Sequence, residues 1–416
     1  MPEAAPIALN ARQVFAIRDF RLLWFAHLIS EFGNGLTSIG LIILVTNLTG
    51  STASVAAMAF AVAFPQVVFG LLAGVFVDRL DNRRVMIGSD LIRGLLVLGF
   101  IPAVASGQLW LMFVLGFAQA TVGTFFMPAR MSLTPALVPE HGLLAANSMM
   151  HTGRVAATSL GAGAVGVLIG FLHISWPIFV LDAATFFASV ALVTAIRTRA
   201  PIFDGTDDEP ANFWAEFSEG LTFIARSPKL IGVIIAVGIA DLGLGATQVL
   251  YAPFFLKDLK VSTAWLGPEE VILSMSMAVS GSLVALLAGK LKPELISPLG
   301  LIAVGLWTGL VGFSTSIWPV LIASAWIGLA LLPNQSALST IFQNSSTREI
   351  RGRVGAAIGT VSQSAAVLSI VLTGVLADLI GLRTMFMAVG VVVVLAGVVA
   401  WWLFRSGDAQ PVTNLA

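Results

Sequence analysis

The chain has 416 residues, of which 57% are hydrophobic and only 11% are charged. A soluble domain carries roughly 25% charged residues, so this chain cannot present a solvated surface on all sides, and lipid must cover most of it. The formal net charge is zero, which gives no indication of nucleic-acid binding. Cysteine is absent, which excludes disulfides, thiolate metal sites and cysteine nucleophiles.

The first twenty residues are polar and mixed in charge. They lack the apolar core and the cleavage site of a signal peptide. We therefore expect the first membrane helix to remain as its own anchor.

Twelve segments are apolar over about 20 residues, the length that a helix needs to cross a bilayer. They predict an all-α membrane protein with twelve transmembrane helices. The segments cover residues 22–46, 52–77, 86–105, 108–128, 144–171, 174–196, 229–256, 263–289, 296–314, 317–341, 353–379 and 382–404.

The 22 lysines and arginines alternate between the two sets of loops. One set, which includes both chain ends, holds 16 of them, the opposite set holds 3, and 3 more lie in or near spans. Because basic residues accumulate in cytoplasmic loops, we expect both termini in the cytoplasm and the protein in a bacterial-type inner membrane.

Residues 197–228 form the longest polar interruption and lie near the middle of the chain. They predict a six-helix bundle over residues 1–196, a cytoplasmic linker over 197–228, and a second six-helix bundle over 229–416. Within the linker, residues 212–226 space their apolar side chains as an amphipathic helix on the membrane surface does. We expect this helix to tether the two halves, in preference to a regulatory role.

Short stretches recur at the same place in each half, 208, 215 and 205 residues apart. Residues 18–22 correspond to 226–230, residues 71–74 to 286–289, and Pro128 to Pro333. Two parallel repeats of six helices predict a substrate site near the membrane midplane between them.

The loop between the second and third spans reads GVFVDRLDNRR over residues 74–84. Gly74 permits close helix packing, Asp78 can accept hydrogen bonds from a helix N-terminus or an arginine, and Arg83 and Arg84 hold the loop in the cytoplasm. A plain basic turn explains the arginines, but it leaves the spacing of Asp78 from Gly74 unexplained. The stretch resembles the conserved loop of the major facilitator superfamily.

That resemblance implies a cytoplasmic latch between the two halves, formed in part by Asp78 and Arg79, with Arg351 or Arg353 as partner. The full set expected at this gate is Gly74, Asp78, Arg79, Arg83, Arg84, Asp90, Arg93, Arg351 and Arg353. Asp90 and Arg93 are three residues apart on one helix, which favours a local ion pair or a clasp on the Asp78 loop over ligand contact.

Further stretches are similar to the exporter group that contains macrolide efflux proteins and the enterobactin exporter. They are residues 18–24, 30–34, 128–130, 135–139, 146–148 and 351–354. Two departures weaken the expected route of proton coupling. Gly116 stands where the family usually has an arginine three residues before Gln119, and the glycine-rich stretch 161–166 lacks the usual proline.

Placing an ionisable side chain inside a membrane span costs free energy, so each such residue in the predicted spans indicates a structural or functional role. Glu31 and Asp241 lie at related positions in the first and seventh spans. Either carboxyl can take up a proton or meet a cationic substrate; the alternative is a structural hydrogen bond to another helix. Arg154 either neutralises Glu31, binds an anionic substrate group or extends its charged end to the membrane interface. Asp182, in the sixth span, is a further candidate for a functional residue.

Neutral polar residues can line a path or bridge helices equally well. The candidates are Asn34, Gln119 and Gln248. With Glu31, Arg154, Asp182 and Asp241 they make the expected proton-coupling and substrate set.

These observations predict a secondary active transporter, a proton-coupled exporter of lipophilic or amphiphilic small molecules such as a drug, macrolide or siderophore. A lysophospholipid or other solute importer or flippase on the same fold is the alternative, and a channel or receptor fits less well. We expect a monomer surrounded by lipid, with protons as the coupling ion. No phosphate-binding loop, cofactor motif or enzyme signature occurs in the sequence.

Overall fold

The structure is a computed structural model, and it describes residues 9–78, 80–172, 176–198, 213–287, 292–346 and 350–406. Within these ranges the chain is helical and contains no strand. The first half comprises α1 (Ala11–Ala16), α2 (Arg18–Thr49), α3 (Thr52–Asp78), α4 (Asn82–Ala105), α5 (Leu109–Leu137), the 3-10 helix η1 (Glu140–Gly142), α6 (Leu143–Leu172) and α7 (Trp176–Thr194).

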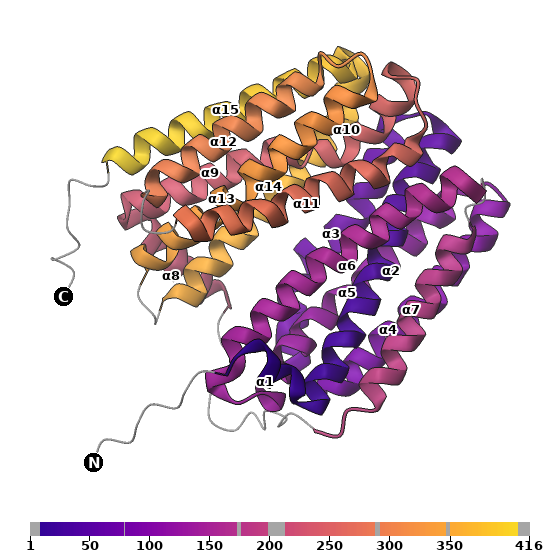
Figure 1. The fold of residues 1–416 in the computed structure, drawn as a ribbon, viewed down its shortest axis with the longest axis vertical. Helices are drawn as coiled ribbons and strands as arrows, with labels where there is room; N and C mark the ends of the chain where they lie inside the picture. Colours follow the sequence, from indigo (N-terminus) through magenta and orange to yellow (C-terminus); the bar gives the residue numbers. More distant parts are fainter. Residues whose placement is uncertain are drawn as a thin grey trace. The chain divides into compact units, whose positions relative to one another are not determined.

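The second half begins with α8 (Phe213–Arg226) and continues through long helices (Figure 1). They are α9 (Pro228–Leu244), α10 (Thr247–Pro253), the π-helix η2 (Phe254–Asp258), the 3-10 helix η3 (Thr263–Trp265), α11 (Leu266–Leu287), α12 (Pro293–Val311), α13 (Ile317–Ser345), α14 (Arg351–Ile380) and α15 (Leu382–Ser406).

All twelve predicted spans coincide with helical segments, which confirms the all-α membrane fold. Ten helical segments of the described chain are long and apolar enough to cross a membrane. The two remaining predicted spans correspond to α6, of 30 residues, and α11, of 22 residues.

The seventh span departs from the prediction of one continuous helix over residues 229–256. The structure divides it into α9, α10 and the π-helix η2, and Gly245 and Ala246 separate the first two. Gly245 packs so closely on α14 that a β-carbon there would lie 2.8 Å from the carbonyl oxygen of Ala366. The break was missed because Gly245 lies inside an unbroken apolar run, where hydropathy alone cannot locate it.

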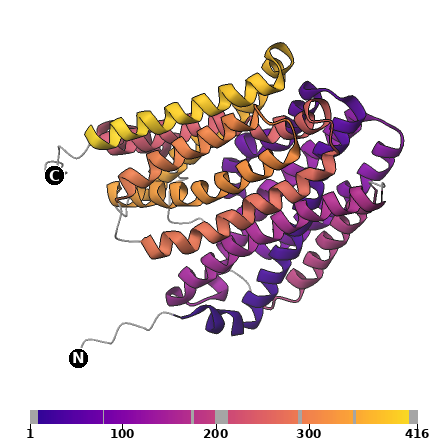
Figure 2. The same ribbon diagram turned by 45° about the horizontal axis from the view of Figure 1, so that its top comes forward.

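Contacts group the residues into two units. Unit 1 comprises residues 1–48, 60–206 and 264–271, and unit 2 comprises 49–59, 207–263 and 272–416. In unit 1, α4 packs against α5 and α7; in unit 2, α12 packs against α13 and α15 (Figures 1 and 2).

Glycines bring α2 and α6 into backbone contact in unit 1. A β-carbon on Gly35 would collide with the carbonyl oxygen of Thr158, and one on Gly161 would collide with the carbonyl oxygen of Phe32. Small residues at both positions therefore set the close approach of the two helices.

The amphipathic helix expected over residues 212–226 is present as α8. In unit 2 its Ile224 is buried with Leu230, Val354 and Ala357, against α9 and α14. Glu219 and Arg353 add an ion pair of 2.5 Å between α8 and α14. Residues 199–212 of the predicted linker lie outside the described part of the chain.

Candidate functional site

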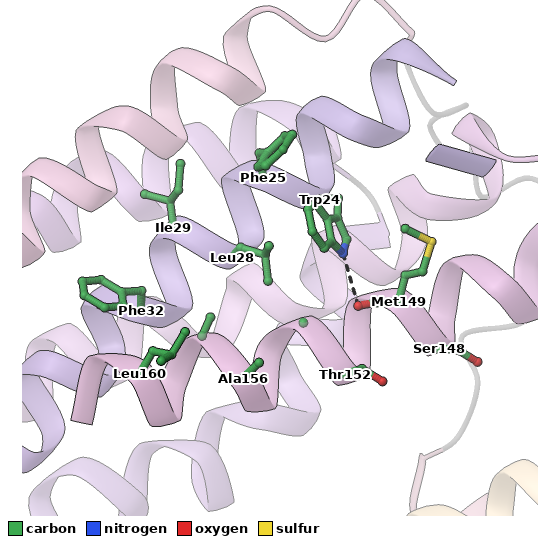
Figure 3. Close-up of a pocket in the computed structure, with 12 residues that line it drawn as sticks. Trp24, Phe25, Leu28, Ile29, Phe32, Ser148, Met149, Thr152, Ala156 and Leu160 are labelled. Carbon is green, nitrogen blue, oxygen red and sulfur yellow. Dashed lines mark hydrogen bonds between the residues drawn. The ribbon is translucent and has the colours of Figure 1, made fainter. Parts of the chain in front are cut away.

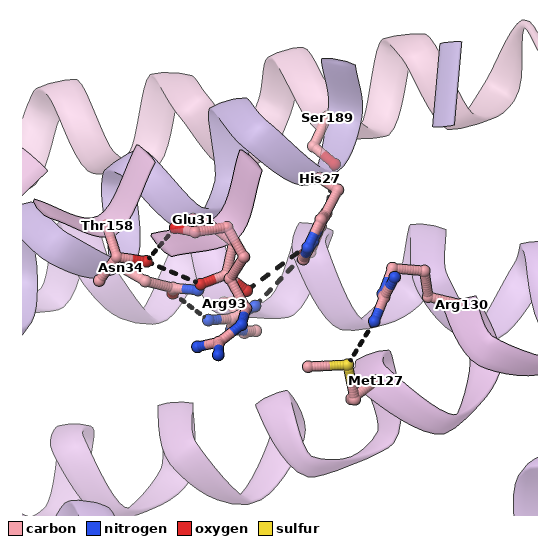
Figure 4. A network of polar contacts seen from close by, with 10 residues as sticks. His27, Glu31, Asn34, Arg93, Met127, Arg130, Thr158 and Ser189 are labelled. Carbon is pink, nitrogen blue, oxygen red and sulfur yellow. Dashed lines mark hydrogen bonds and ion pairs between the residues drawn. The ribbon is translucent and has the colours of Figure 1, made fainter. Parts of the chain in front are cut away.

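A buried ion pair lies on α4 in unit 1. Arg93 Nη1 lies 3.4 Å from Asp90 Oδ1, and the two side chains are 9% and 0% exposed. Ser189 on α7 donates a hydrogen bond of 2.6 Å to the other Asp90 oxygen. The guanidinium group of Arg93 also donates to Asn34 on α2 and lies 4.2 Å from the ring centroid of Phe186. Three helices thus converge on Arg93 (Figure 4).

Glu31 extends this network along α2. Its Oε2 accepts a hydrogen bond of 3.3 Å from Thr158 Oγ1 on α6, and its Oε1 lies 3.8 Å from Nδ1 of His27 one turn earlier. The Glu31 side chain remains 15% exposed, so the carboxyl is accessible while held from two sides. Figure 4 shows Glu31, Asn34 and Arg93 pointing toward the same interior region.

Asp182 on α7 is fully buried and packs against Gly33 of α2. Its carboxylate accepts hydrogen bonds from Thr37 on α2 and from Thr185, the latter of 3.3 Å. A β-carbon on Gly33 would collide with Asp182 and Thr185. The glycine therefore makes room for this carboxyl against α2.

An apolar groove runs between α2 and α6 (Figure 3). Its volume is about 740 Å³. The indole nitrogen of Trp24 donates a hydrogen bond of 3.2 Å to the carbonyl oxygen of Met149 and joins the two helices at one end. The remaining walls are almost wholly hydrocarbon, contributed chiefly by Leu28, Phe32, Ala156 and Leu160. Such a groove accommodates apolar molecules.

Asp241 occupies a comparable setting in unit 2. Ser362 Oγ on α14 donates a hydrogen bond of 2.5 Å to Asp241 Oδ2. Asp241 lies four residues before Gly245, where α9 ends. The backbone stays hydrogen-bonded at this break, where the amide nitrogen of Gly245 donates to the carbonyl oxygen of Asp241 at 2.9 Å. Gln248, in α10, is exposed.

Comparison with known proteins places this arrangement in a family. Residues 23–370 match the model of the family described as Major Facilitator Superfamily. The chain belongs to the major facilitator superfamily. It is thus a multi-pass membrane transporter, and not an enzyme.

Two relatives of this major facilitator protein carry functional names. It is 27% identical over 404 residues to the multidrug efflux pump Tap of Mycolicibacterium fortuitum, covering 92% of this chain and 95% of the relative. It is 23% identical over 391 residues to macrolide efflux protein A of Streptococcus pyogenes, covering 91% and 94%. The expected likeness to the macrolide-efflux group is therefore confirmed.

Solved structures agree on the major facilitator fold. A POT family transporter in complex with a thioalcohol-conjugated peptide aligns with a TM-score of 0.72 at 12% identity, covering 94% of this chain and 97% of that one. A bacterial homologue of the iron transporter ferroportin aligns with a TM-score of 0.71 at 15% identity, covering 94% and 99%. At these identities the likeness concerns the fold alone.

The residues expected at the cytoplasmic gate of this major facilitator protein bind different partners. Arg83 donates a hydrogen bond of 3.1 Å from Nε to the carbonyl oxygen of Val193 and a second one to that of Thr194, so it caps the C-terminus of α7. Arg84 is exposed and lies 3.6 Å from Asp81, whose side chain caps α4. Arg351 donates to the carbonyl oxygens of Gln343 and Ser346.

The latch itself stays a prediction. Arg79 and the side chain of Asp78 lie outside the described residues, and Gly74 is described only as part of the α3 backbone. Asp90 and Arg93 form the local ion pair expected from their spacing.

Of the remaining residues expected to contact substrate, some belong to the polar network around Arg93 and Glu31 and others do not. Asn34 joins the network, whereas Gln119 is buried on α5. No ion pair joins Arg154 to Glu31 in the described part of the chain.

Sequence reasoning missed the hydroxyl groups that hold the carboxyls, on Thr37, Thr158, Ser189 and Ser362. Serine and threonine are frequent along these helices, and most of them bond their own backbone. No pattern in the sequence singled out these four. His27 was also missed, although its position four residues before Glu31 was a usable signal.

Proposed function

We propose that this protein is a proton-coupled exporter of lipophilic or amphiphilic small molecules that works by alternating access. The observation that carries the proposal is the polar network around Glu31, on two helices, α2 and α6, whose other residues line an apolar groove. An ionisable group and an apolar binding surface on one helix pair supply the two elements that coupled transport of such molecules requires. The names of the two relatives favour export over import.

Glu31 and Asp241 are the proposed proton carriers. Each carboxylate accepts a hydrogen bond from a hydroxyl group, Thr158 for Glu31 and Ser362 for Asp241. A hydroxyl group can donate to an ionised carboxylate and accept from a protonated one. The hydrogen bond can therefore form whether the carboxyl is ionised or protonated. Proton uptake does not require the surrounding helices to separate.

The coupling is tested in proteoliposomes with an imposed pH gradient and radiolabelled erythromycin as a representative macrolide. In the wild type we expect the gradient to drive transport. In the double variant Glu31→Gln/Asp241→Asn we expect flux to fall to the level measured without a gradient. Matched controls are Glu140→Gln, at an exposed site in η1, and Asp378→Asn, whose side chain is 48% exposed.

Two results would overturn the proposal. Gradient-driven flux that persists in the double variant would remove these carboxyls from coupling. A second measurement compares the accumulation of a panel of lipophilic compounds in cells with and without the protein. Higher accumulation in its presence would identify an importer.

A further inference from the structure

The apolar groove of unit 1 follows one face of α2 (Figure 3). Its lining on this helix runs from Trp24 to Phe32, which is about 12 Å of helix. The two helices touch at the Phe32 end, where a β-carbon on Gly161 would collide with the Phe32 carbonyl oxygen. Because a hydrocarbon core is about 30 Å thick, the groove is no longer than one leaflet of a bilayer is deep.

Arg21 continues the same face of α2 beyond the Trp24 end of the groove. It precedes Phe25 by four residues and Leu28 by seven, so the three side chains lie on one side of the helix. The guanidinium carbon of Arg21 lies 6.0 Å from the ring centroid of Phe15 in α1. The ring of Phe15 meets those of Trp24 and Phe25 at centroid distances of 5.4 and 5.9 Å. Both of these residues line the groove, so ring contacts join Arg21 to it.

The charge of Arg21 has no counterion in the described part of the chain. The side chain is exposed, and it forms neither an ion pair nor a side-chain hydrogen bond with any described residue. Arg18, by contrast, pairs with Asp19 at 3.0 Å. Arg12 in α1 and Glu140 in the adjoining η1 are also exposed. With Glu140 counted, the charges at the start of α2 still sum to a positive value.

Arg21 stands at the level where a membrane span meets the lipid headgroups. The first predicted span begins at residue 22, and tryptophan, as at Trp24, is typical of this interface. Arginine at this level attracts lipids whose headgroups carry net negative charge, and its guanidinium group forms two parallel hydrogen bonds to a phosphate. An unpaired cation at the headgroup level, next to a groove one leaflet deep, matches the two parts of an anionic phospholipid.

We propose that unit 1 binds an anionic phospholipid of the surrounding bilayer, with one acyl chain in the groove between α2 and α6 and the phosphate group at Arg21. The aromatic side chains of Phe15, Trp24 and Phe25 then lie between headgroup and chain, where the lipid changes from polar to apolar. A lipophilic substrate that enters the same groove would displace this chain. The lipid site goes beyond the proposed function, since it requires neither a gradient nor transport.

The test measures binding of the first lipid to the purified, delipidated full-length protein in detergent by native mass spectrometry. The probes are palmitoyl-oleoyl phosphatidylglycerol and palmitoyl-oleoyl phosphatidylcholine, which share their acyl chains and differ in headgroup charge. We expect phosphatidylglycerol to bind about fivefold more tightly, the preference that one interfacial arginine provides.

Two kinds of variant separate the headgroup contact from the groove. Arg21→Gln should abolish the preference by weakening phosphatidylglycerol alone, whereas Arg21→Lys, which keeps the charge, should retain most of it. Ala156 lines the groove on α6, so Ala156→Phe places a ring where the chain lies. This variant should weaken both lipids and leave their ratio unchanged.

Arg405→Gln and Ala184→Phe are the matched controls, and neither should change the affinity for either lipid. Arg405 is exposed at the end of α15 and lies 4.6 Å from the ring centroid of Trp401. Ala184 is exposed on α7 of unit 1.

Three results would overturn the assignment. Equal binding of the two lipids by the wild type would do so without need of any variant, because the groove would then accept a chain with any headgroup. An unchanged ratio in Arg21→Gln would remove the phosphate from Arg21, and unchanged affinities in Ala156→Phe would remove the chain from the groove. A lack of proton-driven flux with an intact lipid preference contradicts only the proposed function.

Discussion

Buried charge in unit 1 is distributed unevenly among the arginines. Arg93 is paired with Asp90, whereas Arg130 donates to the sulfur atom of Met127 and forms no ion pair among the described residues. Removing one partner of a buried pair leaves the other charge uncompensated, which costs about 3–5 kcal/mol, far more than the pair contributes in net terms. The Asp90–Arg93 pair therefore offers a direct measure of how enclosed this network is.

We expect Asp90→Asn to destabilise the protein by about 3 kcal/mol, because Arg93 loses its carboxylate while it stays buried. Glu219→Gln removes the exposed pair with Arg353, whose side chains are 53% and 38% exposed, and should cost under about 1 kcal/mol. Thermal unfolding of both variants in detergent makes the comparison. Equal losses would show that water reaches Asp90 as freely as it reaches Glu219.

At single residues, the sequence predicted the buried ionisable groups and the Asp90–Arg93 pair, but not the hydroxyl groups that bind the carboxyls. Glu31, Asp90, Arg93, Asp182 and Asp241 stand out because charge is rare in apolar spans. Which hydroxyl group binds which carboxyl depends on how the helices rotate about their axes. That rotation is set by packing between helices, which a single sequence does not encode locally.

At the level of helices, close packing of α2 on α6 holds the groove and the Glu31–Thr158 hydrogen bond in place. Gly161→Ala should disturb it, because the new methyl group meets backbone atoms of α2, with Leu36 N at 3.1 Å and the Phe32 carbonyl closer still. Overpacking of this kind costs about 1–3 kcal/mol. We expect a lower unfolding temperature and reduced transport.

Gly88→Ala on α4 is the matched control, since a β-carbon there meets nothing within 4 Å. Alanine favours helix by up to about 1 kcal/mol over glycine, so this variant should keep or raise the unfolding temperature. If Gly161→Ala were as stable as Gly88→Ala, the contact between α2 and α6 would not be as close as the glycines indicate.

The positions of the helices were predictable for a physical reason. A span must be apolar over the thickness of the hydrocarbon core, so the length of each apolar run nearly fixes the helix. The short helix α1 escaped prediction because its residues 11–16 are too few for a membrane span. Its start is fixed instead by Asn10 and Gln13, which cap each other through backbone and side chain. The break in the seventh span escaped because a glycine leaves hydropathy unchanged.

At the level of the whole chain, the distribution of lysine and arginine predicts the orientation in the membrane. Basic residues cluster beside the α3–α4 and α13–α14 connections, as Arg83, Arg84, Arg351 and Arg353 show, whereas residues 103–112 and 310–318 contain none. Basic loops stay in the cytoplasm. The α4–α5 and α12–α13 connections should therefore face outward.

Because the chain contains no cysteine, single cysteines can report orientation without a background. Ser106→Cys and Thr315→Cys lie at exposed positions in the two connections expected outside. On the side expected inside, Leu80→Cys lies at an exposed position in the α3–α4 connection, and Asn344→Cys lies at an exposed position in the last turn of α13. A membrane-impermeant maleimide should label the first pair in intact spheroplasts and the second pair only in inverted vesicles. One helix, α4, lies between Leu80 and Ser106, and one, α13, lies between Thr315 and Asn344. Labelling of all four from one side would therefore mean that neither α4 nor α13 crosses the membrane. The reverse pattern would keep α4 and α13 as crossings but place the basic loops outside.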